Sequence, residues 1–208
     1  MLYLLVRIIA IMILILIVFL TFKKSFLRFN KRKSRIIMAG IIVVLFYILL
    51  LIPFENFVIK FHSPIDVFKY TFLNQNILRV IENDDCAFII YGKDGSSVSC
   101  ISFQKEEGGW RIHSPYVSSG VRLESFGKYH IISNVATNCN KKLILVSEGN
   151  LPKPMSDIKI SDNKNSKFES FFSKYKYVDY YTVFYYTIVD ATIIDYQLII
   201  NGQVLSVY

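Results

Sequence analysis

Two long apolar runs dominate the first 54 residues of this 208-residue chain. Residues 2–22 are apolar apart from Arg7 and Thr21, and residues 36–54 contain no charged side chain. A helix needs about 20 predominantly apolar residues to cross the roughly 30 Å hydrocarbon core of a bilayer. The sequence therefore predicts a transmembrane hairpin over residues 1–54, with spans at about 2–22 and 36–54.

The distribution of charge predicts the orientation of this hairpin. The net charge of +8 lies entirely in residues 1–60, which carry nine basic side chains and one acid, whereas the rest of the chain is neutral. Short loops rich in Lys and Arg stay on the cytoplasmic side of a membrane. We therefore expect a multi-pass cell-membrane protein with loop 23–35 in the cytoplasm, and with the N-terminus and residues 55–208 outside.

The basic residues of loop 23–35 invite two interpretations, contact with anionic lipid and contact with nucleic acid. A loop of thirteen residues that is held at both ends by a membrane is poorly suited to bind in a nucleic-acid groove. Attraction to the anionic inner leaflet explains the same basic residues. We expect contact with the lipid bilayer and none with nucleic acid. The residues concerned are Lys23, Lys24, Arg28, Lys31, Arg32, Lys33 and Arg35.

Residues 55–208 are enough for one compact domain. Ser63, Pro64 and Asp66 are typical of a helix start, because Ser caps, Pro suits the first turn and Asp completes a capping box. Short runs rich in β-branched and aromatic residues then alternate with polar turns, as in an antiparallel sheet. The predicted strands are 77–81, 86–91, 97–103, 109–113, 128–134, 143–147, 177–189, 192–200 and 203–208, with a loop at 150–166 and a second short helix at 167–174.

The pair Asn201-Gly202 is the strongest hairpin signal in the chain, because both residues tolerate the positive φ of a two-residue type I′ turn. Such a turn pairs Ile200 with Gln203 and Leu198 with Leu205, and places the core side chains on the Leu198 face. We expect the C-terminal strand to lie inside the sheet. The predicted fold class is α+β: two N-terminal transmembrane helices, then a mainly antiparallel extracytoplasmic domain with two short helices.

Tyrosine is concentrated in the second part of the chain, where 12 of the 14 tyrosines lie beyond residue 60. In a strand, adjacent residues point to opposite faces, so a tyrosine pair places one ring outward. These rings form either a cross-strand ladder within the sheet or an exposed binding face, and Tyr is enriched at interfaces. The candidate face consists of Tyr175, Tyr177, Tyr180, Tyr181, Tyr185 and Tyr186.

The three cysteines, Cys86, Cys100 and Cys139, leave at least one thiol unpaired. Cys86 and Cys100 lie on predicted neighbouring strands, so a disulfide is possible if the turn between them has three residues; buried thiols are the alternative. No cysteine spacing indicates a zinc site, and no glycine pattern indicates a nucleotide. We predict no metal, no cofactor and no catalytic residue.

These observations favour a membrane-anchored, non-catalytic extracytoplasmic domain that binds a protein or a cell-envelope ligand. An alternative is an accessory subunit of a membrane transporter or secretion complex, in which the hairpin mediates assembly. An extracytoplasmic enzyme with a Cys or His site ranks third, because no Cys-His or Ser-His motif is apparent in the sequence.

Overall fold

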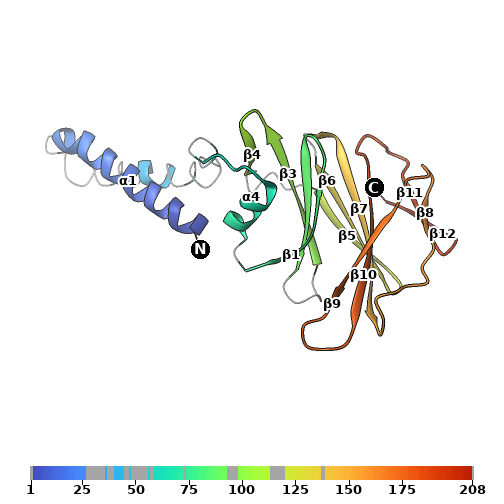
Figure 1. Cartoon of the computed structure of the whole chain (residues 1–208). Helices are drawn as coiled ribbons and strands as arrows, with labels where there is room; N and C mark the ends of the chain where they lie inside the picture. The colour runs from blue at the N-terminus through green and yellow to red at the C-terminus, as the bar shows by residue number, and fades with distance from the viewer. Residues whose placement is uncertain are drawn as a thin grey trace.

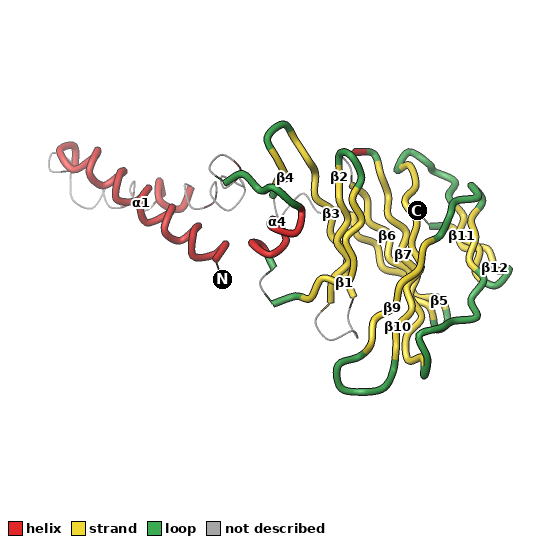
Figure 2. The backbone as a smooth tube through the Cα atoms, in the orientation of Figure 1, coloured by secondary structure: helices red, strands yellow, loops and turns green. Residues whose placement is uncertain are grey.

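The computed structural model of the chain describes residues 2–26, 36, 40–44, 47, 56, 59–72, 74–92, 98–112, 120–136 and 139–207. Within these residues, strands dominate, and twelve of them form three antiparallel sheets (Figure 2). Helix α1 (Leu2–Phe26) lies at the N-terminal end of the molecule, and helix α4 (Pro64–Thr71) lies between it and the sheets (Figure 1).

Sheet A contains, in spatial order, β1 (Asn76–Glu82), β2 (Cys86–Gly92), β3 (Val98–Glu106) and β4 (Gly109–Arg111). Sheet B has the order β5 (Gly120–Phe126), β6 (Tyr129–Ala136), β7 (Lys141–Leu151), β10 (Tyr181–Asp190) and β9 (Glu169–Lys174). Sheet C has the order β12 (Gln203–Ser206), β11 (Gln197–Ile200) and β8 (Ile160–Asp162).

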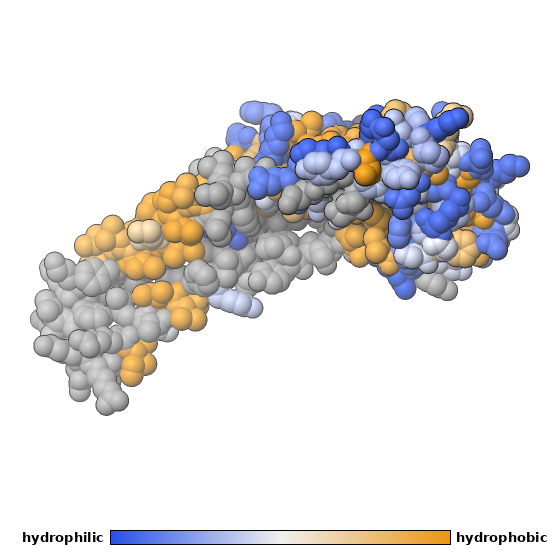
Figure 3. Space-filling model, turned by 90° about the horizontal axis from the view of Figure 1, so that it is seen from below, coloured by the Kyte–Doolittle hydropathy of each residue, from blue (hydrophilic) through white to orange (hydrophobic). Residues whose placement is uncertain are grey.

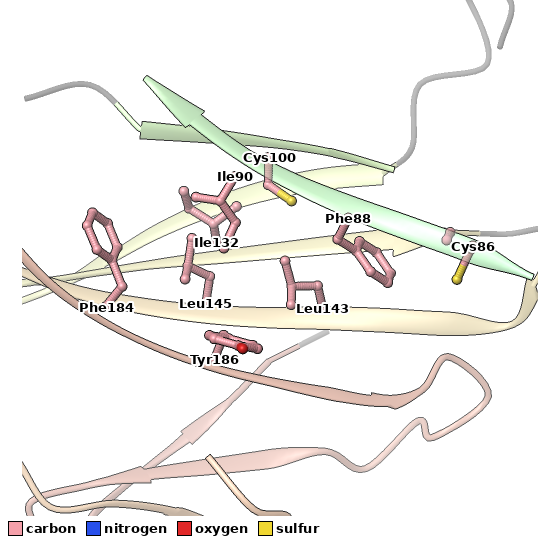
Figure 4. Packing of buried hydrophobic residues seen from close by; sticks show 10 residues of the cluster. Cys86, Phe88, Ile90, Cys100, Ile132, Leu143, Leu145, Phe184 and Tyr186 are labelled. Carbon is pink, nitrogen blue, oxygen red and sulfur yellow. The ribbon is translucent and has the colours of Figure 1, made fainter. Parts of the chain in front are cut away.

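Three apolar clusters hold these elements together as successive layers. One lies between α4 and sheet A, the second between sheets A and B, and the third between sheets B and C. Strand β2 is buried on both faces: Phe88 and Ile90 contribute to the second cluster, and Ile89 to the first (Figure 4). Because successive side chains alternate between faces, a strand covered on both sides reads as the continuous apolar run that β2 shows.

The predicted capping box at the start of α4 is confirmed. The Ser63 hydroxyl accepts a hydrogen bond from the Asp66 amide at 3.1 Å, and the Asp66 carboxylate accepts one from the Ser63 amide at 3.1 Å. Pro64 occupies the first helical turn, where its missing N–H costs no hydrogen bond. Phe68 is fully buried on the face that packs against sheet A.

The predicted pairing of the C-terminal hairpin is also confirmed: Ile200 lies opposite Gln203, and Leu198 lies opposite Leu205. Asn201 and Gly202 have φ angles of 50° and 82°. The expected interior position of the last strand is wrong, because β12 is an edge strand of the small sheet C and its side chains are mostly exposed.

The two predicted membrane spans are not supported. Within the residues that the structure describes, no helix combines the length and the apolarity required to cross a membrane. Helix α1 covers the first predicted span. Its described side chains, at 5–13, 15–17 and 20, include exposed apolar residues (Figure 3). Arg7 is buried. Of span 36–54, only residues 36, 40–44 and 47 are described. We therefore correct the expectation of a multi-pass cell-membrane protein.

The α+β class is corrected as well, since the described part of the chain is mainly β-sheet. Of residues 167–174, expected as a short helix, Glu169–Lys174 instead form strand β9 at the edge of sheet B. Phe171 stacks on Phe184 of the neighbouring strand with 4.7 Å between the ring centroids. Pairing with the long strand β10 provides backbone hydrogen bonds on one side of this segment and leaves Phe171 half-buried, so tertiary contacts outweigh the helical spacing of its aromatic residues.

Candidate ligand-binding cavity

A cavity of about 700 Å³ lies between sheets A and B. The inner face of sheet B carries apolar side chains along most of its length, among them Leu143, Leu145 and Phe184 (Figure 4). Beyond them, the side chains on the same face are smaller and more polar. The described residues that line the cavity are Val98, Leu123, Lys128, His130, Ile132, Ser147, Gly149, Asn150, Tyr175 and Thr182.

Strand β7 illustrates how the sequence creates this change. Leu143, Leu145, Ser147 and Gly149 follow one another at every second position and therefore share one face. The first two are fully buried in the cluster between the sheets, whereas Ser147 and Gly149 line the cavity. The side chains shrink along this face, and the space they leave is the cavity.

Thr182, near the start of β10, has a buried hydroxyl at the cavity wall. The residue is 5% exposed, and among the described contacts its Oγ1 has no hydrogen-bond partner. A buried polar group that lacks a partner costs about 1–3 kcal/mol. In native structures such groups are few, because most buried polar atoms pair with protein or with an ordered water molecule.

Gly149 borders the same point of the wall. A Cβ at this position would lie 3.2 Å from the hydroxyl oxygen of Tyr175 and 3.6 Å from Oγ1 of Thr182. The absence of a side chain at position 149 therefore lets the Tyr175 hydroxyl approach the backbone closely. The next residue, Asn150, has a φ of 60°, a left-handed conformation that Asn tolerates better than most residues.

The positive charge of the cavity lining is partly neutralised by a neighbouring acidic residue. The Lys128 ammonium forms an ion pair with Glu148, whose side chain is 4% exposed. The hydrogen bond to Glu148 raises the pKa of Lys128 above its usual value. Nδ1 of His130 lies 3.2 Å from Oγ of Ser125, its cross-strand neighbour on β5. The described lining contains no Asp or Glu.

The six candidate tyrosines do not share one surface. Tyr175 lines the cavity, whereas Tyr177 and Tyr180 are 78% and 46% exposed in the loop between β9 and β10. Tyr181 is half-buried and meets the ring of Phe172 edge-on. Tyr185 packs against the cluster between sheets B and C, and Tyr186 is buried between sheets A and B.

The cysteines are free thiols, and the structure does not pair the two that were candidates for a disulfide. In the register of β2 and β3, Cys86 lies opposite Gln104 and Cys100 lies opposite Ile90. Cys86 instead interacts with Cys139, which packs against the same apolar cluster. Burial, followed by the interaction with Cys139, raises the pKa of Cys86 to about 12.

The basic loop proposed to contact lipid falls largely beyond the described part of the chain. Lys23 and Lys24 belong to the last turns of α1, and the other five residues, Arg28, Lys31, Arg32, Lys33 and Arg35, lie outside the described residues. Their predicted contact with the bilayer stays a prediction. Among the residues that are described, no group of three or more His, Cys, Asp or Glu side chains could hold a metal ion.

Reasoning from the sequence missed Gly149 and Thr182, the two residues that shape the polar end of the cavity. Their signal is weak. Thr182 interrupts a run of aromatic and β-branched residues, and Gly149 ends the apolar series at alternate positions of β7. A glycine inside a strand can mark the close approach of another group, but only the three-dimensional structure identifies that group as a pair of hydroxyls.

Comparison with family models, with curated proteins and with solved structures gives no match for this chain.

Proposed function

We propose that the sheet-rich part of the chain is a non-catalytic binding module that holds a small ligand in the cavity between sheets A and B. The observation that carries this proposal is a cavity of about 700 Å³ whose described wall combines apolar side chains, among them Leu123 and Ile132, with a few polar ones. Ligand sites in proteins are typically about 300–1,000 Å³, mostly apolar, with a few polar groups that fix the orientation of the ligand.

The surroundings of His130 favour binding over catalysis. A serine nucleophile needs a histidine base, and a third group usually orients that base. Ser125 and His130 are within hydrogen-bonding distance, but among the described contacts no carboxylate bonds to His130. The contact with Ser125 therefore orients the imidazole of His130 at the cavity wall, but the third member of a hydrolytic triad is missing among the described contacts.

Binding of 1-anilinonaphthalene-8-sulfonate, a dye with an apolar ring system, tests the proposal on the full-length chain. We expect saturable binding of one dye molecule per chain. Leu123→Ser removes an apolar contact from the cavity wall, and we expect about fivefold weaker binding, equivalent to ~1 kcal/mol of lost apolar contact. Because Leu123 is 63% exposed, the substitution should leave the fold intact.

Val121→Ser is the matched control, because Val121 lies two residues away on the same face of β5 and outside the described lining. It should leave the dissociation constant unchanged. Equal effects of the two substitutions, or dye binding that neither of them alters, would place the dye elsewhere and refute the proposal. Melting temperatures recorded on both variants establish that differences in binding do not arise from unfolding.

A further inference from the structure

Strand β5 forms one edge of sheet B, and among the described residues only β6 pairs with it. The two strands are joined by a two-residue turn, so Phe126 and Tyr129, which flank the turn, exchange their backbone hydrogen bonds. Because this direction alternates along a strand, the amide and carbonyl groups of Val121, Leu123 and Ser125 point away from β6. A row of such groups is a template on which another strand can pair.

This edge lacks the features that usually prevent strand pairing. Natural proteins protect an edge strand with prolines, β-bulges or short length. Strand β5 has seven residues and no proline, and its register with β6 is unbroken. The edge strand β1, by contrast, has a register shift between Ile77 and Arg79. Strand β5 also exposes two large apolar side chains on one face, Leu123 at 63% and Val121 at 44%.

The charged residues of β5 are complementary to those of a second β5. Arg122 and Glu124 lie on the face opposite Leu123, and within one chain Nε of Arg122 is 3.0 Å from Oε1 of Glu124. A two-fold axis perpendicular to the sheet makes two copies of the strand antiparallel and keeps each side chain on its own face. When this axis passes through Leu123, Arg122 of each copy lies opposite Glu124 of the other. Opposite charges at directly facing positions stabilise a strand pair.

The charges also select this register over its neighbours. If the axis moves by one residue, either Arg122 lies opposite Arg122 of the second copy or Glu124 lies opposite Glu124. Like charges directly opposite each other destabilise a strand pair. With the axis at Leu123, the two leucine side chains meet, and Val121 lies opposite Ser125 of the second copy. These are the residues whose backbone groups point outward, so each pair can exchange both of its hydrogen bonds.

We infer that β5 pairs with β5 of a second copy of this chain, antiparallel and about a two-fold axis at Leu123, so that sheet B continues from one copy into the other. On one face of the joined sheet, Arg122 and Glu124 of both copies form a ring of alternating charges. On the other face, Leu123 loses exposed apolar surface. The inference goes beyond the proposed binding function and does not depend on it, because neither Arg122 nor Glu124 belongs to the described cavity lining.

Cysteine cross-linking tests the register in the full-length chain, in a Cys139→Ser background that leaves only the two buried native thiols. In Leu123→Cys, the introduced thiol faces its own copy across a hydrogen-bonded pair, where Cα atoms are about 5.5 Å apart and a disulfide can form. In the matched control Val121→Cys, the two thiols are four residues apart along the strand, roughly 13 Å. We expect copper phenanthroline to link Leu123→Cys into dimers at least tenfold faster than Val121→Cys. Equal rates at the two positions, or no dimer at either, would refute the pairing.

A charge exchange tests the ring of alternating charges in the same Leu123→Cys protein. Arg122→Glu places like charges opposite each other, and we expect cross-linking to become at least tenfold slower. Adding Glu124→Arg restores opposite charges with their signs exchanged, and the rate should return to within about twofold of the parent. The Arg122 side chain is 55% exposed, so the melting temperatures of these variants should match that of the parent. An unchanged rate in Arg122→Glu, or a double variant that melts normally but stays slow, would contradict the inference.

Discussion

The hydroxyl of Tyr196 donates a 2.9 Å hydrogen bond to Oδ2 of Asp162, and both side chains are buried. Asp162 ends β8, and Tyr196 directly precedes β11. The other carboxylate oxygen of Asp162 accepts hydrogen bonds from the backbone amides of Lys164 and Ser166, at 3.1 and 2.8 Å. One carboxylate therefore holds the turn after β8 and attaches it to the start of the C-terminal hairpin.

Removal of the Tyr196 hydroxyl should destabilise the protein. In Tyr196→Phe the ring stays buried, but Asp162 loses a donor, and hydrogen bonds to charged groups contribute about 1.5–3 kcal/mol. Because the two amides still bond to the carboxylate, we expect a loss of about 1.5 kcal/mol in the free energy of unfolding, measured by urea titration at pH 7. Tyr177→Phe, at a position that is 78% exposed, should change it by less than about 0.5 kcal/mol. Equal stability of Tyr196→Phe and the wild type would contradict this account.

Asp162 should also contribute to the acid sensitivity of the fold. Burial by itself raises the pKa of Asp162, but hydrogen bonds from Ser166, Tyr196 and Lys164 outweigh burial and leave its pKa below the usual value. A depressed native pKa stabilises the folded state above the pKa of the unfolded chain, and this stability is lost as the pH falls through the native pKa.

Asp162→Asn should therefore be less stable than the wild type at neutral pH, and the difference should narrow below about pH 4, the usual pKa range of Asp. Urea titrations at pH 7, 5, 4 and 3 measure the difference. If the difference in the free energy of unfolding between the two proteins stays constant over this pH range, the ionisation of Asp162 does not contribute to stability.

The turn at Asn201-Gly202 gives a test of the C-terminal hairpin. Gly202 has a φ of 82°, a conformation that costs other residues roughly 1–2 kcal/mol. The side chain of Asn201 accepts a hydrogen bond from the Lys159 amide at 2.9 Å and donates one to the Tyr129 hydroxyl at 2.9 Å. We expect Gly202→Ala to reduce the free energy of unfolding by about 1 kcal/mol in urea titration. Gly202→Asn should lose less of this free energy, since Asn tolerates positive φ. A Gly202→Asn variant that is less stable than Gly202→Ala would contradict the assigned turn.

Local signals in the sequence were sufficient to predict the start of α4 and the register of this hairpin. The capping box uses residues three positions apart, and the turn fixes a register from two residues, so neither depends on the rest of the fold. The segments that were assigned incorrectly depend on distant partners. Strand β8 lies in a segment expected as a loop, and β9 gains its backbone hydrogen bonds from β10. Strand β5 was missed because Arg122 and Glu124 alternate with Val121 and Leu123 along an edge strand.

The cavity could not be predicted for a related reason. Its described lining comes from both sheets that form the inter-sheet core, and the order of strands in sheet B brings β10 beside β7. Only this order places Thr182 near Gly149, 33 positions earlier in the chain. The sequence identified Tyr175 as one of six tyrosines of interest but could not separate it from Tyr186, which is a core residue with its hydroxyl bonded to Glu169.

The three thiols differ in their surroundings. Cys100 is buried between the sheets, and burial raises the pKa of its thiol far above the usual value. Cys86 is 1% exposed, and burial together with Cys139 raises its pKa to about 12. Cys139 is half-buried in the turn before β7, and its thiol donates a 3.7 Å hydrogen bond to the carbonyl of Ala136.

Because the thiolate is the reactive form of cysteine, these differences predict the order of alkylation. In the folded protein at pH 8, iodoacetamide should modify Cys139 first, and peptide mass spectrometry should find Cys86 and Cys100 largely unmodified. In urea all three residues should react at similar rates, which provides the internal control. Cys139→Ser should leave the native protein nearly inert to the reagent, because the remaining thiols are both buried and protonated. Rapid labelling of Cys100 in the native state would mean that sheets A and B separate readily, and it would contradict the packing between them.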